Sequence, residues 1–178
     1  APGNAGTREQ GTNVNLDIGN FKAIGDYVIS QKIDMVVVGP EAPLVAGIYD
    51  YFRENKKLKK VPVIGPSRKG AMLEGSKKFA KEFMIRNNIP TAKFLNVTLN
   101  DYEQGLDFLQ TMEAPFVLKA DGLAAGKGVL ICETFQEAEQ ELKTMLLGKF
   151  GDSSKNVVIE EYLSGIRSEE HTSELSHR

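Results

Sequence analysis

Hydrophobic positions in the first half of the chain follow two alternating periods, one typical of strands and one typical of helices. Continuous apolar runs at 34–39 and 61–65 predict strands, and the first run is typical of a strand buried on both faces. Apolar residues at helical spacing at 21–28 and 40–55 predict helices, and a further helix is expected from residue 74 onward. This alternation favours a parallel sheet with crossover helices.

The pattern of apolar and polar residues changes in the second half of the chain, which indicates a domain boundary near 90–94. Its apolar runs predict strands at 92–97, 116–119, 129–132 and 156–163. Helices are expected after capping boxes at Asn100–Glu103 and Thr134–Glu137, where a polar side chain and an acid three residues later bond each other's backbone N–H groups.

Composition narrows the classes of protein. The chain has 178 residues, enough for one ordinary domain or two small ones, and its formal net charge of −2 gives no sign of a nucleic-acid or membrane surface. No signal peptide or spanning run is visible, so a cytoplasmic location is expected. Cys132 is the only cysteine and cannot form an internal disulfide. The only histidines, His171 and His177, are too near the end to serve a histidine-based site in the body of the chain.

The clearest chemical signal is the stretch KADGLAAGKG, which begins at Lys119 and places small residues before Lys127. Only three residues separate Gly122 from Gly126, and Gly128 stands where a Walker loop has Ser or Thr. Predicted strands lie on both sides, whereas a Walker loop leads into a helix. Flexible backbone between two lysines indicates a flap over a polyphosphate, and an ordinary surface turn is the alternative.

Three shorter stretches are weaker signals. PGNAGT, near the start, could present N–H groups to a phosphate or form an ordinary turn. VGPEAPL follows a predicted strand and places Glu41 where open α/β sheets bind ligands, although an acid is also favoured at a helix start. IEEYL ends a predicted strand with Glu160 and Glu161, which must face opposite sides, so only one of them can point into a given cleft.

Taken together, PGNAGT, VGPEAPLVAG, LEGSKKFAKEFM, KADGLAAGKGV and VVIEEYLSG resemble the glycinamide ribonucleotide synthetase (phosphoribosylamine–glycine ligase) family of the ATP-grasp superfamily, over residues 1 to about 166. The resemblance implies an α/β fold. Residues 1–93 would form a partial, Rossmann-like parallel-sheet domain that binds phosphoribosylamine and ends in a linker helix. Residues 94–166 would form the small ATP-grasp lid subdomain.

The resemblance also implies an activity and a site. The family ligates glycine to 5-phosphoribosylamine with ATP through glycyl phosphate, giving glycinamide ribonucleotide, ADP and phosphate in purine biosynthesis, with Mg²⁺ or Mn²⁺. Lys119 would contact the α- and β-phosphates, 120–128 would close over them, and Glu160 would accept from the adenine amino group. The implied ATP-binding residues are Lys77, Lys119, Gly122, Gly126, Lys127, Gly128, Glu160, Glu161, Tyr162 and Leu163. The implied phosphoribosylamine-binding residues are Pro2, Gly3, Asn4, Gly6, Thr7, Gly39, Pro40, Glu41 and Pro43.

The sequence departs from the family pattern at both ends. It begins just after a glycine-rich segment of the GGREHA type, and Arg167 stands where the family has an acid that holds the ATP ribose. Residues 167–178 have no apolar face and resemble translated sequencing adapter, with a genuine helix as the alternative. We therefore expect a fragment without metal ligands, catalytic residues or a complete glycine site, inactive alone, from a family expected to be monomeric. Another purine-pathway carboxylate–amine ligase, or a nucleotide-binding module of an ATP-grasp ligase without catalysis, are the alternatives.

Overall fold

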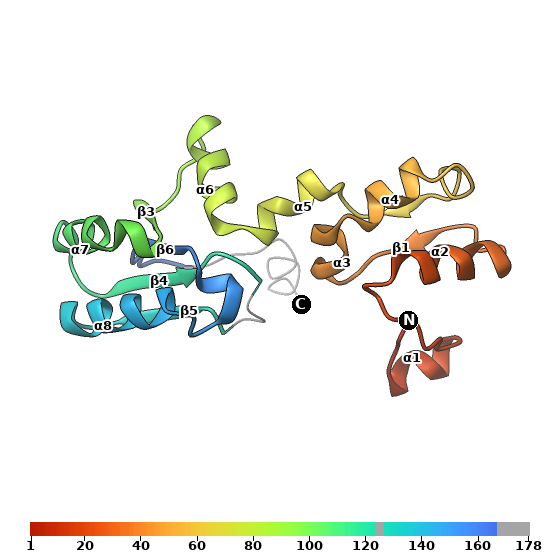
Figure 1. The fold of residues 1–178 in the computed structure, drawn as a ribbon, viewed down its shortest axis with the longest axis horizontal. Coiled ribbons are helices and arrows are strands. Elements are labelled where there is room, and N and C mark those ends of the chain that lie inside the picture. Colours follow the sequence, from red (N-terminus) through yellow and green to blue (C-terminus); the bar gives the residue numbers. More distant parts are fainter. Residues whose placement is uncertain (124–126, 167–178) are drawn as a thin grey trace. The chain divides into compact units, whose positions relative to one another are not determined.

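The computed structural model describes residues 1–123 and 127–166, which form two compact units (Figure 1). Unit 1 comprises residues 1–88 together with Asp121–Leu123, and unit 2 comprises Ile89–Ala120 and the described residues from Lys127 onward. Unit 1 holds a parallel sheet and unit 2 an antiparallel one, so the predicted α/β class is confirmed. Within the described ranges, no helix is long and apolar enough to cross a membrane.

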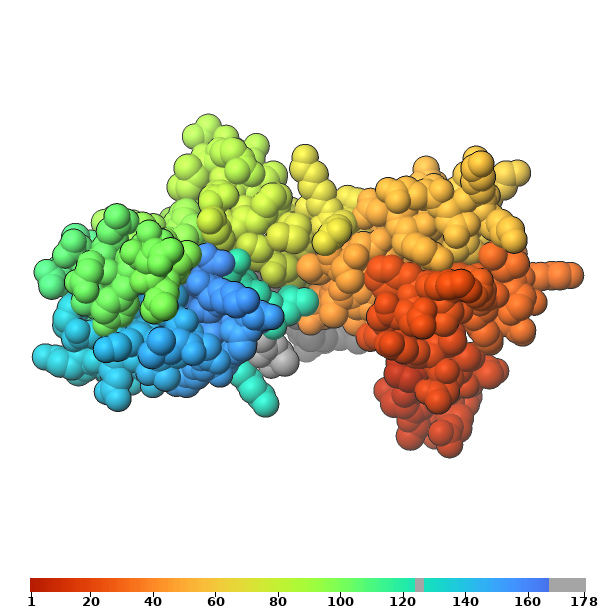
Figure 2. All heavy atoms as spheres, viewed as in Figure 1, coloured from red at the N-terminus to blue at the C-terminus, as the bar shows by residue number. Residues whose placement is uncertain are grey.

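Unit 1 packs helices against one side of a short parallel strand pair. Its elements are α1 (Ala5–Gln10), α2 (Phe21–Ser30), β1 (Val36–Val37), α3 (Glu41–Ala46), α4 (Ile48–Glu54), β2 (Val63–Ile64), α5 (Arg68–Gly75) and α6 (Lys77–Arg86). Val36 lies opposite Val63, and the small core gathers around Phe52 and Leu58, which are buried. The N-terminal residues, red in Figure 2, form a protruding lobe in which every residue of α1 is exposed.

The prediction that the first strand is buried on both faces is wrong. Val36 packs against the core of unit 1, but the side chain of Val37 is 66% exposed and that of Ile64, beside it in β2, is 53% exposed. Successive side chains of a strand point to opposite faces, so a two-stranded sheet with a core on one side leaves its other side open. An apolar run therefore indicated the strand correctly and its burial incorrectly.

Two predicted helices are each interrupted. The helix expected over 40–55 is split into α3 and α4 by Gly47, whose φ of +99° is a left-handed conformation that favours glycine. The helix expected from residue 74 is instead α5 followed by α6. Ser76 between them has extended backbone, and its hydroxyl accepts from the Phe79 N–H at 3.0 Å. A serine that caps α6 in this way ends the preceding helix.

Unit 2 is a four-stranded antiparallel sheet in the order β3-β6-β4-β5. Its elements are β3 (Phe94–Val97), a 3₁₀ turn (Leu99–Asp101), α7 (Tyr102–Gln110), β4 (Phe116–Ala120), β5 (Val129–Cys132), α8 (Phe135–Leu146), a second 3₁₀ turn (Gly151–Ser154) and β6 (Val157–Glu161). All the strands predicted for this half are present. The last strand in sequence, β6, lies inside the sheet between β3 and β4, so it receives hydrogen bonds along both edges.

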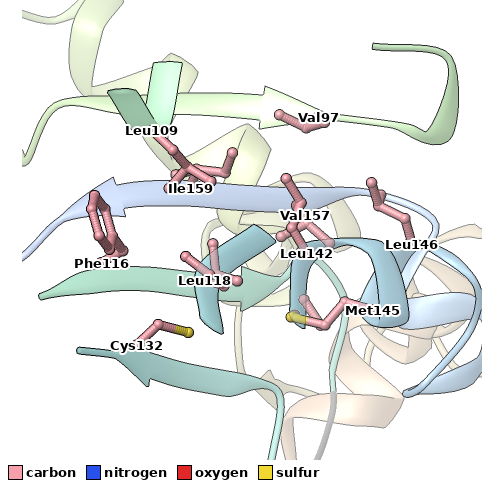
Figure 3. Packing of buried hydrophobic residues seen from close by; sticks show 12 residues of the cluster. Val97, Leu109, Phe116, Leu118, Cys132, Leu142, Met145, Leu146, Val157 and Ile159 are labelled. Carbon is pink, nitrogen blue, oxygen red and sulfur yellow. The ribbon is translucent and has the colours of Figure 1, made fainter. Parts of the chain in front are cut away.

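The core of unit 2 lies between this sheet and helices α7 and α8, as Figure 3 shows from close by. Alternate strand residues contribute to it, including Leu118 of β4 and Ile159 of β6, which are fully buried. The other labelled members are Val97, Leu109, Phe116, Cys132, Leu142, Met145, Leu146 and Val157. Strand alternation places the residues between them, such as Lys119, on the opposite face of the sheet.

Of the two predicted capping boxes, the first is wrong and the second has its cap at the predicted residue. The box expected at Asn100 is wrong, because Thr98 begins the turn instead and its hydroxyl donates to the Asp101 carboxylate at 2.5 Å. Thr134 caps α8 as predicted, and its hydroxyl accepts from the Glu137 N–H at 3.2 Å. The Glu137 carboxylate accepts from the N–H one residue before the cap, at 2.9 Å, rather than from the cap itself.

Candidate functional site

An ion pair between β4 and β6 occupies the face of the unit 2 sheet that α7 and α8 do not cover. The Lys119 ammonium lies 2.9 Å from the Glu160 carboxylate, and the two side chains are 28% and 6% exposed. Lys119 is opposite Val158 in the register, and Glu160 is two residues further along β6, so the two side chains share a face diagonally. A carboxylate this buried is stabilised by its cationic partner, and removing either partner leaves an uncompensated charge.

Glu161 is on the other side of β6 and has a different bonding partner. Its carboxylate accepts from the Lys93 N–H at 2.8 Å, and its own N–H donates to the Lys93 carbonyl at 3.0 Å. This exchange ties the end of β6 to the segment that enters β3. Of the two adjacent acids, only Glu160 shares a face with Lys119, as strand alternation requires. Tyr162 and Leu163 follow directly and are exposed.

The glycine-rich segment joins β4 to β5, as predicted. Its base is closed by a backbone hydrogen bond in which the Ala120 N–H donates to the Gly128 carbonyl at 2.7 Å. Gly128 is buried and Lys127 is exposed. Gly126 and the tail 167–178, on which further predictions were made, lie outside the described residues.

A cluster within unit 1 involves the residue that begins the same segment, Asp121. Its carboxylate accepts from the Ser76 hydroxyl at 3.0 and 3.1 Å and from the Lys78 N–H at 2.7 Å. The Lys77 ammonium donates to the carbonyls of Asp121 at 3.4 Å and Gly122 at 3.2 Å. The sequence indicated Lys77 and Gly122 but not Asp121 or Ser76. Ser76 and Asp121 are 45 positions apart in the sequence, so no local pattern could have revealed the contact.

The N-terminal stretch PGNAGT folds into a hydrogen-bonded turn. The Asn4 side chain accepts from the Thr7 N–H at 3.0 Å, and the Thr7 hydroxyl donates to the Asn13 amide oxygen at 2.8 Å. The Asn13 amide in turn donates to the Asn4 carbonyl at 2.8 Å. Gly3 is left-handed, with φ of +82°, and a Cβ there would meet the Asn13 side chain. Asn13 therefore organises the predicted residues Pro2–Thr7, although nothing in the sequence singled it out.

The second N-terminal stretch forms the turn between β1 and α3. Pro40 is the N-cap of α3 and Glu41 its first residue, the position where an acid is favoured by the helix dipole. Pro40 and Pro43 line a cavity of about 620 Å³, which also borders Ala1 and the exposed side of β1. Among the described residues, no group of three or more His, Cys, Asp or Glu side chains is placed to hold a metal ion.

A family model of an ATP-grasp domain matches the second half of the chain and gives the class of protein, and solved structures share the fold. The chain is similar to the crystal structure of phosphoribosylamine–glycine ligase from Thermotoga maritima, with a TM-score of 0.68, 31% identity, and coverage of 93% of this chain and 37% of that one. D-alanine–D-alanine ligase from Bacillus anthracis matches with a TM-score of 0.64 over 86% of this chain and 46% of that one, and at 18% identity this likeness concerns the fold alone.

Sequence comparison then gives the family. Residues 1–74 match the phosphoribosylglycinamide synthetase N domain, and residues 75–172 match the ATP-grasp (A) domain of the same synthetase. The chain therefore belongs to the phosphoribosylglycinamide synthetase family. Phosphoribosylamine–glycine ligases from Escherichia coli O157:H7 and Vibrio parahaemolyticus are 47% and 46% identical to it over 168 residues. Those 168 residues are 93% of this chain and 38% of each relative, so the chain spans well under half their length.

Proposed function

We propose that this chain contributes the nucleotide-binding lid and part of the amine-substrate domain to a phosphoribosylamine–glycine ligase. The reaction is the ATP-dependent ligation of glycine to 5-phosphoribosylamine, through glycyl phosphate, giving glycinamide ribonucleotide, ADP and phosphate. The observation that carries the proposal is the Lys119–Glu160 pair on the sheet face opposite α7 and α8, with Lys119 at the start of the glycine-rich segment. The family membership and the relatives' names support the choice of substrates.

The residues present fit a purine nucleoside triphosphate. Glu160 offers a buried carboxylate that accepts hydrogen bonds, which suits an adenine amino group. Lys119 offers an ammonium that is partly exposed beside it, which suits a phosphate oxygen. A nucleotide lying along this face can contact both ends of the pair, so the ion pair is shared with the ligand rather than broken. The backbone of Tyr162 and Leu163 completes the adenine contact in this proposal.

The remaining site residues divide between two proposed domains. The lid subdomain, 94–166, supplies further ATP contacts from Gly122, Lys127 and Gly128, and Lys77 adds a second lysine near the phosphates. Residues 1–93 bind phosphoribosylamine through the PGNAGT turn and the turn at Gly39–Pro43. Mg²⁺ or Mn²⁺ bound with ATP would neutralise charge developing on the phosphates, and the described residues offer no group of acids that would hold the ion. We place the activity in the cytoplasm, as expected for an enzyme of small-molecule biosynthesis. We expect no nucleic-acid or membrane partner.

The test is ATP affinity, measured by isothermal titration calorimetry on the chain and two lysine variants. Lys119→Ala is expected to weaken ATP binding by about 1–3 kcal/mol, the usual loss for a hydrogen bond to a charged group. Lys149→Ala is the matched control, because Lys149 also pairs with a glutamate of unit 2, Glu141, but away from the proposed site. The proposal fails if both variants bind ATP as tightly as the parent chain.

A second measurement separates ligase activity from nucleotide binding alone. ADP release is followed with ATP, Mg²⁺, glycine and 5-phosphoribosylamine, omitting each in turn. Release that depends on both small substrates identifies the ligase. ATP binding without such release identifies a nucleotide-binding module that needs the rest of a longer protein for chemistry.

A further inference from the structure

The Asp121 carboxylate binds both sequence neighbours of Lys77. Ser76 donates to it from its hydroxyl and Lys78 from its backbone N–H, at 3.0 and 2.7 Å. The Ser76 hydroxyl also accepts from the Phe79 N–H, so one serine caps α6 and orients the carboxylate together. A carboxylate at this end of a helix is favoured by the helix dipole, which strengthens the attachment.

Lys77 itself is bonded to the backbone of the same segment. Its N–H donates to the Asp121 carbonyl at 3.3 Å, and its ammonium donates to the carbonyls of Asp121 and Gly122. The direction of the Lys77 side chain therefore depends on where the Asp121–Gly122 backbone lies. That backbone is in turn held by the carboxylate of Asp121 against Ser76 and Lys78.

We propose that Asp121 is a positioning residue, which directs the Lys77 ammonium toward the nucleotide by fixing the Asp121–Gly122 backbone to the start of α6. The proposal rests on the proposed function, because it takes Lys77 to be a nucleotide contact. It differs from a purely structural cap in one measurable way. A positioning residue affects nucleotide affinity through Lys77, whereas a cap affects the stability of α6 whether or not Lys77 is present.

A double-mutant cycle measures that difference, with ATP affinity determined by calorimetry on the full chain. Asp121→Ala and Lys77→Ala are each expected to weaken ATP binding about tenfold, the loss typical of one charged contact. The double variant is expected to bind within about twofold of Lys77→Ala, because residues that act as one unit are not additive. Asp121→Asn keeps the acceptor oxygen and is expected to recover most of the affinity.

Independent losses, about a hundredfold in the double variant, would show that Asp121 affects ATP affinity without Lys77 and would overturn the inference. Asn20→Ala is the matched control, because it removes the side-chain cap of α2, also in unit 1, without touching Lys77. It is expected to leave ATP affinity unchanged.

Amide hydrogen exchange without ligand gives a reading that does not depend on nucleotide binding. Asp121→Ala is expected to lose protection at the Lys77 and Lys78 N–H groups, while Asn20→Ala retains it. If the parent chain binds no ATP, the proposed function fails and the exchange result alone decides whether Asp121 anchors Lys77. Unchanged protection at both amides in Asp121→Ala would refute the anchoring.

Discussion

The two units bury their sheets to different extents. In unit 2, α7 and α8 cover one face of four strands, and Leu118, Val157 and Ile159 are fully buried beneath them. In unit 1, two strands of two residues each leave Val37 and Ile64 largely exposed, beside an apolar cavity. Regions with few buried apolar contacts open more easily. We therefore expect unit 2 to be the more stable unit, and hydrogen exchange to show it.

The difference matters for the proposed site. Lys119 and Glu160 lie on adjacent strands whose opposite face is packed against helices, so the pair is held by a well-packed support. Binding groups act best when such support fixes their geometry. The N-terminal turn around Asn4 instead relies on a few exposed hydrogen bonds of its own.

The largest expected effect tests the packing of unit 2. Leu118→Ala removes a fully buried side chain from the centre of its sheet and should lower the free energy of unfolding by about 2–5 kcal/mol. Urea denaturation gives the total loss, and hydrogen exchange resolved by peptide assigns it. A loss confined to peptides of unit 1 would contradict the comparison.

The next prediction concerns the thiol of Cys132, buried in β5. Burial, with nearby Glu137 and Glu141, raises the pKa of this thiol to about 11. Alkylation at pH 8 should therefore be at least about thirtyfold slower in the native chain than in urea, since the thiolate is the reactive form. Because the folded state favours the protonated thiol, its contribution to stability is complete below about pH 9 and declines as the pH rises through about 11. Native labelling as fast as that of the denatured chain would show that unit 2 is not closed around the thiol.

A smaller effect is expected at the start of α8. Thr134→Ala removes the hydroxyl that accepts from the Glu137 N–H, which should cost about 1 kcal/mol. The loss is measured by urea denaturation, with Thr134→Ser as the control because serine keeps the hydroxyl. Equal losses in the two variants would mean that the methyl group, not the cap, matters at this position.

The smallest effect is expected on the open side of unit 1. Val37→Thr replaces an exposed β-branched residue with another of the same shape, and stability should change by less than about 0.5 kcal/mol. A loss of 2 kcal/mol or more, as expected for a core position, would show that Val37 is covered in solution and that the contrast between the units is overstated.

The sequence predicted the location of strands better than their burial or their order in the sheet. Apolar runs located the strands of both units, because the side-chain period is a local property. Burial of Val37 was predicted wrongly, because burial depends on what packs against a strand. The order β3-β6-β4-β5 could not be predicted, since it pairs segments distant in the chain.

Local competition between polar residues explains the smaller errors. Asn100 was a reasonable cap, but Thr98 and Asp101 form a better reciprocal pair two residues earlier. Ser76 interrupted a predicted helix by capping the next one. At the site, the motifs singled out Lys119 and Glu160, while Asp121 and Asn13 stayed hidden because their partners are revealed only by the folded chain.

The path of the backbone has a consequence for recombination between related genes. The chain leaves unit 1 after Asn88 and returns to it at Asp121, where the carboxylate meets Ser76. A genetic crossover between related genes anywhere from 77 to 120 would therefore join a serine from one parent to an aspartate from the other. Such a hybrid keeps the contact only if both parents carry a compatible pair. The residues at positions 76 and 121 are thus expected to covary. Dividing the coding sequence after residue 88 would separate two residues that are in contact in the folded protein.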